Sequence, residues 1–247
     1  MHADLLDAEA AIQWADSQIP LFQQGFIEWL RANPHPVVIE MHPDSRSQAA
    51  VVYDLPFPLT FNAWAGAILN GFHSALDMIA AALAVRNGKH PDAHTHFPIF
   101  RSLHDFIDPL TGIESKKWLS VRERAAIKAL KPYDGGDATL WPLHHLDILR
   151  KHQRLIVARP EIPGYVMVGG RRARPGGEFV MERLENKTVL FRLSPGERLN
   201  ATQGNTLFTH GVFFDEIVLG SPKQEVAMTL KRFSVRVSEI LAGIDRL

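Results

Sequence analysis

The residues with the clearest chemical potential are a histidine and an aspartate inside a long apolar segment. His73 and Asp77 are four residues apart, so a helix places both on one face. Burying both side chains costs free energy unless they are paired or hydrogen-bonded. The pair is typical of half a metal site or of an acid–base couple. A structural pair that anchors a neighbouring segment has the same spacing and is the commoner use of buried polar groups.

A second group lies in another predicted helix, where histidines, an aspartate and a lysine stand close together. His145 and His152 are seven residues apart and nearly superpose on one face, while His144, Asp147 and Lys151 share a neighbouring face. This composition is compatible with metal ligation, phosphate binding or proton transfer. Asp147 and Lys151 also have the spacing of an ordinary surface salt bridge, so the helix predicts either a site or a solvated face.

Two further patterns involve segments that read as loops. His94 and His96 form a His-x-His pair that could clamp a metal ion if carboxylates came from elsewhere. Asp108, Glu114 and Lys116 have the Asp…Glu-x-Lys spacing of metal-dependent nucleases, but a proline and a glycine interrupt the hairpin that this pattern needs. The sequence has no P-loop, nucleophile elbow, zincin helix or dinucleotide-binding glycine motif.

Composition excludes several classes of site and of protein. The 247-residue chain has no cysteine, which removes disulfides, thiolate nucleophiles and cysteine-ligated metals. Any metal would therefore need histidine and carboxylate ligands. With 46% hydrophobic residues, and 27 basic against 27 acidic side chains, the chain is too apolar and too neutral to be disordered.

The neutral total conceals an uneven distribution of charge. Residues 1–30 carry five acids and no lysine or arginine, whereas residues 150–174 carry seven bases and one acid. The basic run is typical of a phosphate or nucleic-acid surface, or of a solvated strand face that the acidic N-terminus partly neutralises. An anionic small molecule or a nucleic acid bound there would contact Arg150, Arg154, Arg159, Arg171, Arg172 and Arg174.

Hydrophobic periodicity and turn signals predict the elements that position these residues. Helices are expected at 4–33, 60–85, 120–130, 140–153 and 223–244, and strands at 37–41, 49–53, 155–158, 165–168, 179–181, 189–193 and 212–219. In the first helix, Leu6, Ala10 and Trp14 recur every four residues, and Phe22, Phe26, Trp29 and Leu30 repeat this apolar pattern further on. Pro20 predicts a kink or a second helix. Asn87 and Gly88 end the second helix in the manner of a C-cap.

This order of elements predicts an α+β fold with an antiparallel sheet rather than alternating βαβ units. We expect one domain, with a helical half at about 1–153 around the long central helix, a β-rich half at about 154–222 and a closing C-terminal helix at about 223–245. The first residues lack the basic and apolar regions of a secretory signal. A membrane helix over 62–85 would bury His73 and Asp77, which is expensive. We therefore predict a soluble, cytoplasmic protein with no membrane partner.

Four short motifs occur in an order that resembles one protein family. They are Ser74-Ala75-Leu76-Asp77, Phe97-Pro98-Ile99, Pro132-Tyr133 and Leu146-Asp147…Lys151-His152. Over about residues 66–154 the chain resembles an uncharacterised family of bacterial and phage-associated proteins of similar length. It departs from the family pattern at residues 70–73, at Lys131 and at Arg150. The resemblance brings no activity, but it implies the fold and implies that Asp77, Lys151 and His152 are spatial neighbours.

Two functional hypotheses follow. The first is a non-enzymatic or binding protein in which Asp77, Lys151 and His152 belong to a buried structural network and the basic run offers a surface to an anionic partner. The second is a metal-dependent hydrolase of phosphoesters, with His73, Asp77, Lys151 and His152 as catalytic candidates and a divalent metal held by His73, Asp77, His145 and His152. A divalent metal is the only cofactor that either hypothesis invokes. The hydrolase requires at least three of these four ligands to converge on an open cleft.

Overall fold

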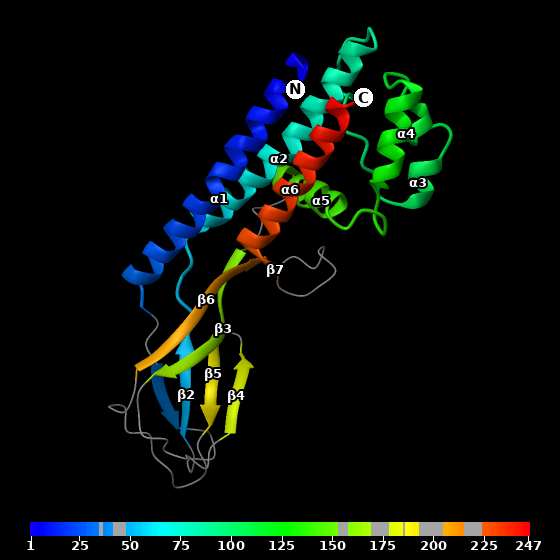
Figure 1. The fold of residues 1–247 in the computed structure, drawn as a ribbon. Helices are drawn as coiled ribbons and strands as arrows, with labels where there is room; N and C mark the ends of the chain where they lie inside the picture. Colours follow the sequence, from blue (N-terminus) through cyan, green and yellow to red (C-terminus); the bar gives the residue numbers. More distant parts are fainter. Residues whose placement is uncertain are drawn as a thin grey trace. The chain divides into compact units, whose positions relative to one another are not determined.

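The computed structural model describes residues 1–34, 37–41, 48–152, 158–168, 178–184, 186–192, 205–214 and 224–247, and it confirms the α+β fold (Figure 1). The helices are η1 (Ala3–Leu5), α1 (Leu6–Ala32), α2 (Leu59–Arg86), α3 (Leu103–Ile107), η2 (Ile113–Ser115), α4 (Val121–Leu130), α5 (Leu140–His152) and α6 (Val226–Asp245). The strands are β1 (Val37–Met41), β2 (Gln48–Tyr53), β3 (Ala158–Val168), β4 (Glu178–Arg183), β5 (Lys187–Arg192), β6 (Asn205–Phe214) and β7 (Gln224–Glu225).

The strands form two small sheets, in the orders β1-β2-β5-β4 and β3-β6-β7. The strands predicted at 37–41 and 49–53 are present: β1 pairs antiparallel with β2, with Val38 opposite Val51 and Ile39 opposite Ala50. β2 then pairs antiparallel with β5, and β5 with β4. The chain divides into two compact units, one of residues 1–23, 58–159 and 212–247, the other of residues 24–57 and 160–211. The expected single domain stays a prediction.

The first unit is built on the long helix α2, which lies beside the N-terminal part of α1 and beside α6 (Figure 1). The rings of Phe22 and Phe61 meet edge to face with centroids 5.7 Å apart, which places the first turn of α2 against α1. At Gly71 a Cβ atom would lie 2.9 Å from the side chain of Ala15, so glycine permits the close approach of the two helices. Lys231 and Ser234 of α6 both contact the carboxylate of Asp16 on α1.

The predicted helix ends are confirmed where the sequence carries capping signals. α2 ends at Arg86, with Asn87 as its C-cap and Gly88 in the left-handed region at φ 67°. α4 starts with a complete capping box between Ser120 and Glu123. α2 is long and apolar enough to cross a membrane by length and composition alone, but 67% of its most apolar window is buried inside the fold.

The apolar pattern predicted for the first helix is wrong by a small rotation in its N-terminal part, whereas the predicted Phe22 and Phe26 are buried. Leu6 and Trp14 are about half exposed, and Ala10 is exposed as well. The buried stripe of η1 and α1 consists of Leu5, Ala8, Ile12, Ala15, Ile19, Phe22 and Phe26. Every member of this stripe is three or four residues from the next, so the helical period holds while its phase differs from the predicted one. Pro20 lies inside α1, and no second helix starts there.

The predicted strands agree less closely with the structure. β6 begins earlier than expected, at Asn205, and residues 215–219 of that prediction lie outside the described residues. The two strands expected at 155–158 and 165–168 correspond to the single strand β3, apart from residues 155–157, which also lie outside the described part.

Candidate functional site

The candidate site lies in the first unit, where α5 packs on α2. α2 is apolar on most sides, and His73 is a buried polar residue near its middle, 7% exposed. Asp137 lies just ahead of α5, and its carboxylate accepts hydrogen bonds from the backbone N–H groups of Thr139 and Leu140. Its buried face carries Leu143, Leu146 and Asp147, and the last of these has no exposed surface.

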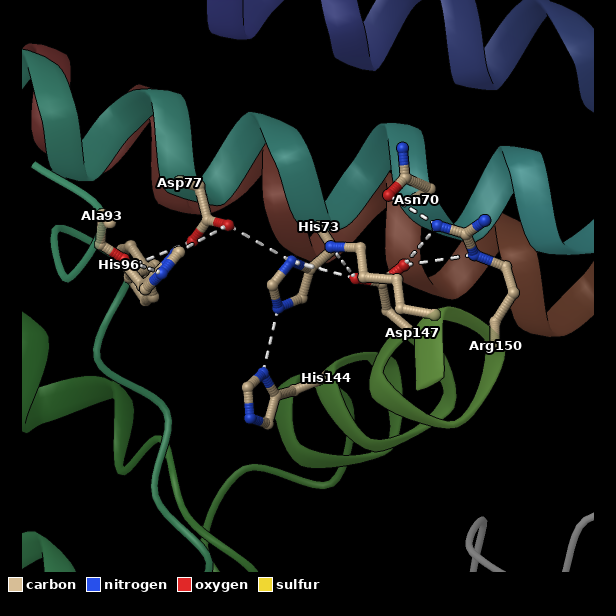
Figure 2. A network of polar contacts seen from close by, with 10 residues as sticks. Asn70, His73, Asp77, Ala93, His96, His144, Asp147 and Arg150 are labelled. Atoms are coloured by element: carbon tan, nitrogen blue, oxygen red, sulfur yellow. Dashed lines mark hydrogen bonds and ion pairs between the residues drawn. The ribbon is translucent and has the colours of Figure 1, made fainter. Parts of the chain in front are cut away.

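His73 is the centre of the polar contacts (Figure 2). Its Nε2 atom lies 2.9 Å from Nδ1 of His144, and the two rings are stacked with centroids 5.2 Å apart. Its Nδ1 atom faces two carboxylates, with Asp147 Oδ2 at 3.3 Å and Asp77 Oδ2 at 3.5 Å. These two contacts are longer than a good hydrogen bond, so charge rather than a directional bond dominates on this side of the ring.

Asp147 is held by two cations of its own helix. Arg150 lies 3.2 Å from Oδ1 and Lys151 lies 2.5 Å from Oδ2, at the i+3 and i+4 positions. The Arg150 guanidinium also donates to Oδ1 of Asn70 on α2 at 2.7 Å. The aliphatic part of the Arg150 side chain crosses α2 at Gly66, where a Cβ atom would lie only 2.5 Å from Cδ of Arg150. A fully buried carboxylate is thus compensated by positive charge on the solvent side.

Asp77 connects the helix to the segment that follows it. Its Oδ1 atom accepts a hydrogen bond from the backbone N–H of Phe97 at 3.0 Å, and its Oδ2 atom lies 3.3 Å from Nδ1 of His96. The other ring nitrogen of His96 is 2.8 Å from the carbonyl oxygen of Ala93 (Figure 2). Asp77 therefore anchors the loop after α2, while its second oxygen remains part of the histidine network.

Burial sets the ionisation of the two central imidazoles. Desolvation, with a smaller contribution from the neighbouring His73 ring, lowers the pKa of His144 from 6.5 to about 4. Desolvation also lowers the pKa of His73, against the opposing effect of the Asp77 and Asp147 carboxylates. Both rings are therefore neutral at pH 7, and each has one nitrogen that can accept a proton.

These side chains line an open pocket of about 360 Å³. Five of the chain's 12 histidines contribute to it. The lining residues come from α2, the 94–100 segment, Lys116 and α5: His73, Asp77, His94, His96, Phe97, Pro98, Ile99, Phe100, Lys116, His144, Asp147, Ile148, Lys151 and His152. Such a volume is at the small end of ligand-binding sites in proteins.

The structure brings together most of the predicted site residues. His73, Asp77, Lys151 and His152 all line the pocket, so three of the four ligands proposed for the hydrolase reach one open site. His145 does not line it, and its ring lies against Trp141 with centroids 5.8 Å apart.

Two central residues, His144 and Asp147, belong to the second group found in the sequence but not to the predicted catalytic residues or metal ligands. The i, i+3, i+7 spacing of His144, Asp147 and Lys151 was the signal for them. Sequence alone could not show that this face of α5, rather than the face of His145, turns toward α2. That choice depends on tertiary packing.

The geometry does not favour a metal centre at the predicted ligands. Among the described residues, no group of three or more histidine and acidic side chains is arranged to hold a metal ion. Figure 2 shows His96, Asp77, His73 and Asp147 in a row rather than around a common point. The metal set of His73, Asp77, His145 and His152 stays a prediction.

The nuclease-like pattern does not assemble. Asp108 accepts backbone N–H bonds from Leu110 and Thr111 in its own turn. Glu114 pairs with Lys128, and only Lys116 of the pattern reaches the pocket. Its ammonium lies 5.9 Å from the ring centre of Phe100.

The basic run is only partly described. Arg150 belongs to the Asp147 network. Arg159 is placed by its backbone in β3, and Arg154, Arg171, Arg172 and Arg174 lie outside the described residues. Two acids of the N-terminal run have partners elsewhere, since Asp4 pairs with Arg86 and Asp16 with Lys231.

Comparison of the chain with protein-family models, with curated proteins and with solved structures finds no match. The family resemblance over residues 66–154 therefore stays a prediction, and the site has to be interpreted from its own geometry.

Proposed function

We propose that this protein binds a small anionic ligand in the pocket between α2, the 94–100 segment and α5, with the buried Asp/Lys/His network as the rigid wall of the site. The observation that carries the proposal is the convergence of five histidines and two lysines, Lys116 and Lys151, on one open pocket. A purely structural network would satisfy its own members without gathering exposed histidines around a hollow.

Charge favours an anion over a cation. Both pocket carboxylates are already engaged: Asp147 by Arg150 and Lys151, and Asp77 by the backbone N–H of Phe97 and by His96. Within the described residues no carboxylate lies at ion-pair distance from Lys116, whose ammonium is thus available to a ligand. Lysine and histidine are common phosphate-binding groups, so a phosphate-bearing molecule fits this lining best.

Titration with inorganic phosphate tests the binding proposal. A ligand that binds only the native state raises the melting temperature as its concentration increases. We expect such a rise for the wild-type chain and its loss in Lys116→Met. Lys89→Met removes an exposed lysine outside the pocket and serves as the matched control. A wild-type melting temperature that does not respond to phosphate contradicts the proposal.

A hydrolase of phosphoesters is the second candidate, and one observation favours it: His73, Asp77 and His152 line the same open pocket as the neutral His144 ring. Its metal-dependent form predicts that Zn²⁺ or Mn²⁺ raises the melting temperature and that EDTA reverses the effect. A melting temperature that changes with neither ion contradicts a metal site. Both candidate functions keep the soluble, cytoplasmic setting expected from the sequence.

A further inference from the structure

We propose that His144 is the proton-accepting catalytic residue of the pocket, with His73 and Asp147 as the relay that holds its Nε2 atom unprotonated, in a protein that hydrolyses the phosphoester it binds. This inference rests on the proposed function, because the ester must be held by the lysines of the same pocket. It needs no metal, and it gives catalytic roles to His144 and Asp147, which are not among the catalytic residues or metal ligands predicted from the sequence.

The first step fixes the proton of His73. Its Nδ1 atom faces Asp147 Oδ2 at 3.3 Å and Asp77 Oδ2 at 3.5 Å. Carboxylate oxygens only accept, so a lone pair on Nδ1 would be repelled from both sides in a buried, low-dielectric place. The proton of the neutral His73 ring therefore lies on Nδ1, and its Nε2 atom carries the lone pair.

The second step fixes the proton of His144. Nε2 of His73 and Nδ1 of His144 are 2.9 Å apart, which requires one donor and one acceptor. Since Nε2 of His73 is the acceptor, Nδ1 of His144 is the donor. The remaining lone pair of His144 is then on Nε2, which lies on the side of the ring away from His73 (Figure 2). His144 lines the pocket, so this lone pair is available to a bound molecule.

The third step is the chemistry that this arrangement allows. As the oxygen of a water molecule bonds to the phosphorus of the bound ester, His144 Nε2 takes a proton from that water. The bond from phosphorus to the leaving alcohol breaks, and the alcohol oxygen takes a proton from solvent through the open side of the pocket. The proton on His144 Nε2 then returns to the same solvent, so that one water is consumed in all. The charge gained by the imidazole is shared with His73, where Asp77 and Asp147 stabilise it. Nδ1 of His73, a buried group without a good hydrogen bond in the resting protein, gains from this charge.

The tautomers can be measured without any substrate. In ¹⁵N-histidine-labelled full-length protein at pH 7, two-bond nitrogen–hydrogen couplings report which ring nitrogen carries the proton. We expect His144 to be protonated on Nδ1 and unprotonated on Nε2, and Asp147→Asn to change that ratio. A wild-type His144 with its proton on Nε2 overturns the inference, even if Asp147→Asn does not fold.

Hydrolysis is tested with p-nitrophenyl phosphate and bis(p-nitrophenyl) phosphate as probes. We expect His144→Gln to lower the rate by about 100-fold, which is the usual scale of a general base. His104→Gln, at a side chain that is 87% exposed on α3, should leave the rate unchanged. Absence of hydrolysis above buffer, or an unchanged rate in His144→Gln, overturns the inference. The two proposals fail in different ways. If phosphate raises the melting temperature but His144 carries its proton on Nε2, the binding proposal stands and the His144 inference fails. If the esters are hydrolysed but phosphate does not raise the melting temperature, only the binding proposal is contradicted.

Discussion

Asp147 is the residue on which the buried network depends, because its carboxylate has no exposed surface and faces Arg150, Lys151 and His73. Asp147→Asn keeps the shape but leaves two cations beside a neutral amide. Breaking a buried ion pair on one side costs about 3–5 kcal/mol, and we expect a loss of that order in the free energy of unfolding. Urea denaturation measures it. Asp105→Asn, at a side chain that is 48% exposed, is the control and should change stability by less than about 0.5 kcal/mol.

The histidine pair also predicts how stability depends on pH. Folding lowers the pKa of His144 from 6.5 to about 4, so between these values the unfolded chain binds more protons than the native one. The free energy of unfolding should therefore fall as pH drops from about 6.5 to 4, by up to roughly 3 kcal/mol from this group. The lowered pKa of His73 acts in the same direction.

Urea denaturation at pH 7 and at pH 5 measures this dependence. His144→Gln should show a weaker loss of stability on acidification than the wild type. Equal losses in the two proteins would show that the buried imidazole is not the titrating group.

At the scale of elements, α2 meets its neighbours through glycines. Gly66→Ala would place a Cβ atom 2.5 Å from Cδ of Arg150 and force that side chain away from Asn70 and Asp147. We expect a loss of about 1–3 kcal/mol in the free energy of unfolding, as for other overpacked sites. Gly243→Ala in α6 has no atom within 4 Å of the new Cβ and should instead stabilise the protein by about 0.5–1 kcal/mol. If Gly66→Ala leaves the free energy of unfolding unchanged or increases it, the Arg150 side chain is not confined at Gly66.

The helical elements were predicted well because their signals are local. The Asn87-Gly88 end of α2 and the helices predicted at 120–130 and 223–244 are all found in the structure. The phase of the stripe on α1 was missed, because Leu6 and Trp14 are as apolar as the residues that are buried. Periodicity gives the repeat of a helix, whereas the direction that faces the core depends on which helices pack around it. Strand boundaries such as those of β6 depend on pairing partners that are distant in sequence.

At the scale of the whole molecule, the basic run remains a prediction of nucleic-acid binding. Arg150 is engaged by Asn70 and Asp147, so the remaining arginines would carry the contact. We expect retention of duplex DNA in a gel shift at low salt and its loss as salt is raised, because phosphate contacts release counterions. Replacing Arg171, Arg172 and Arg174 by glutamine should weaken retention. A wild-type chain that is not retained at low salt contradicts the prediction.

The sequence by itself determined the α+β class, most helix boundaries and the residue types from which a site could be built, because each depends on composition or on neighbours within one or two turns. It also placed His73 and Asp77 on one helix face. Only the tertiary structure decided that His144 rather than His145 faces α2, that Asp147 is fully buried, and that the 94–100 segment returns to Asp77. These choices follow from the packing of segments that are distant in the chain, where burial and opposing charges select one face of α5 among several with similar residues.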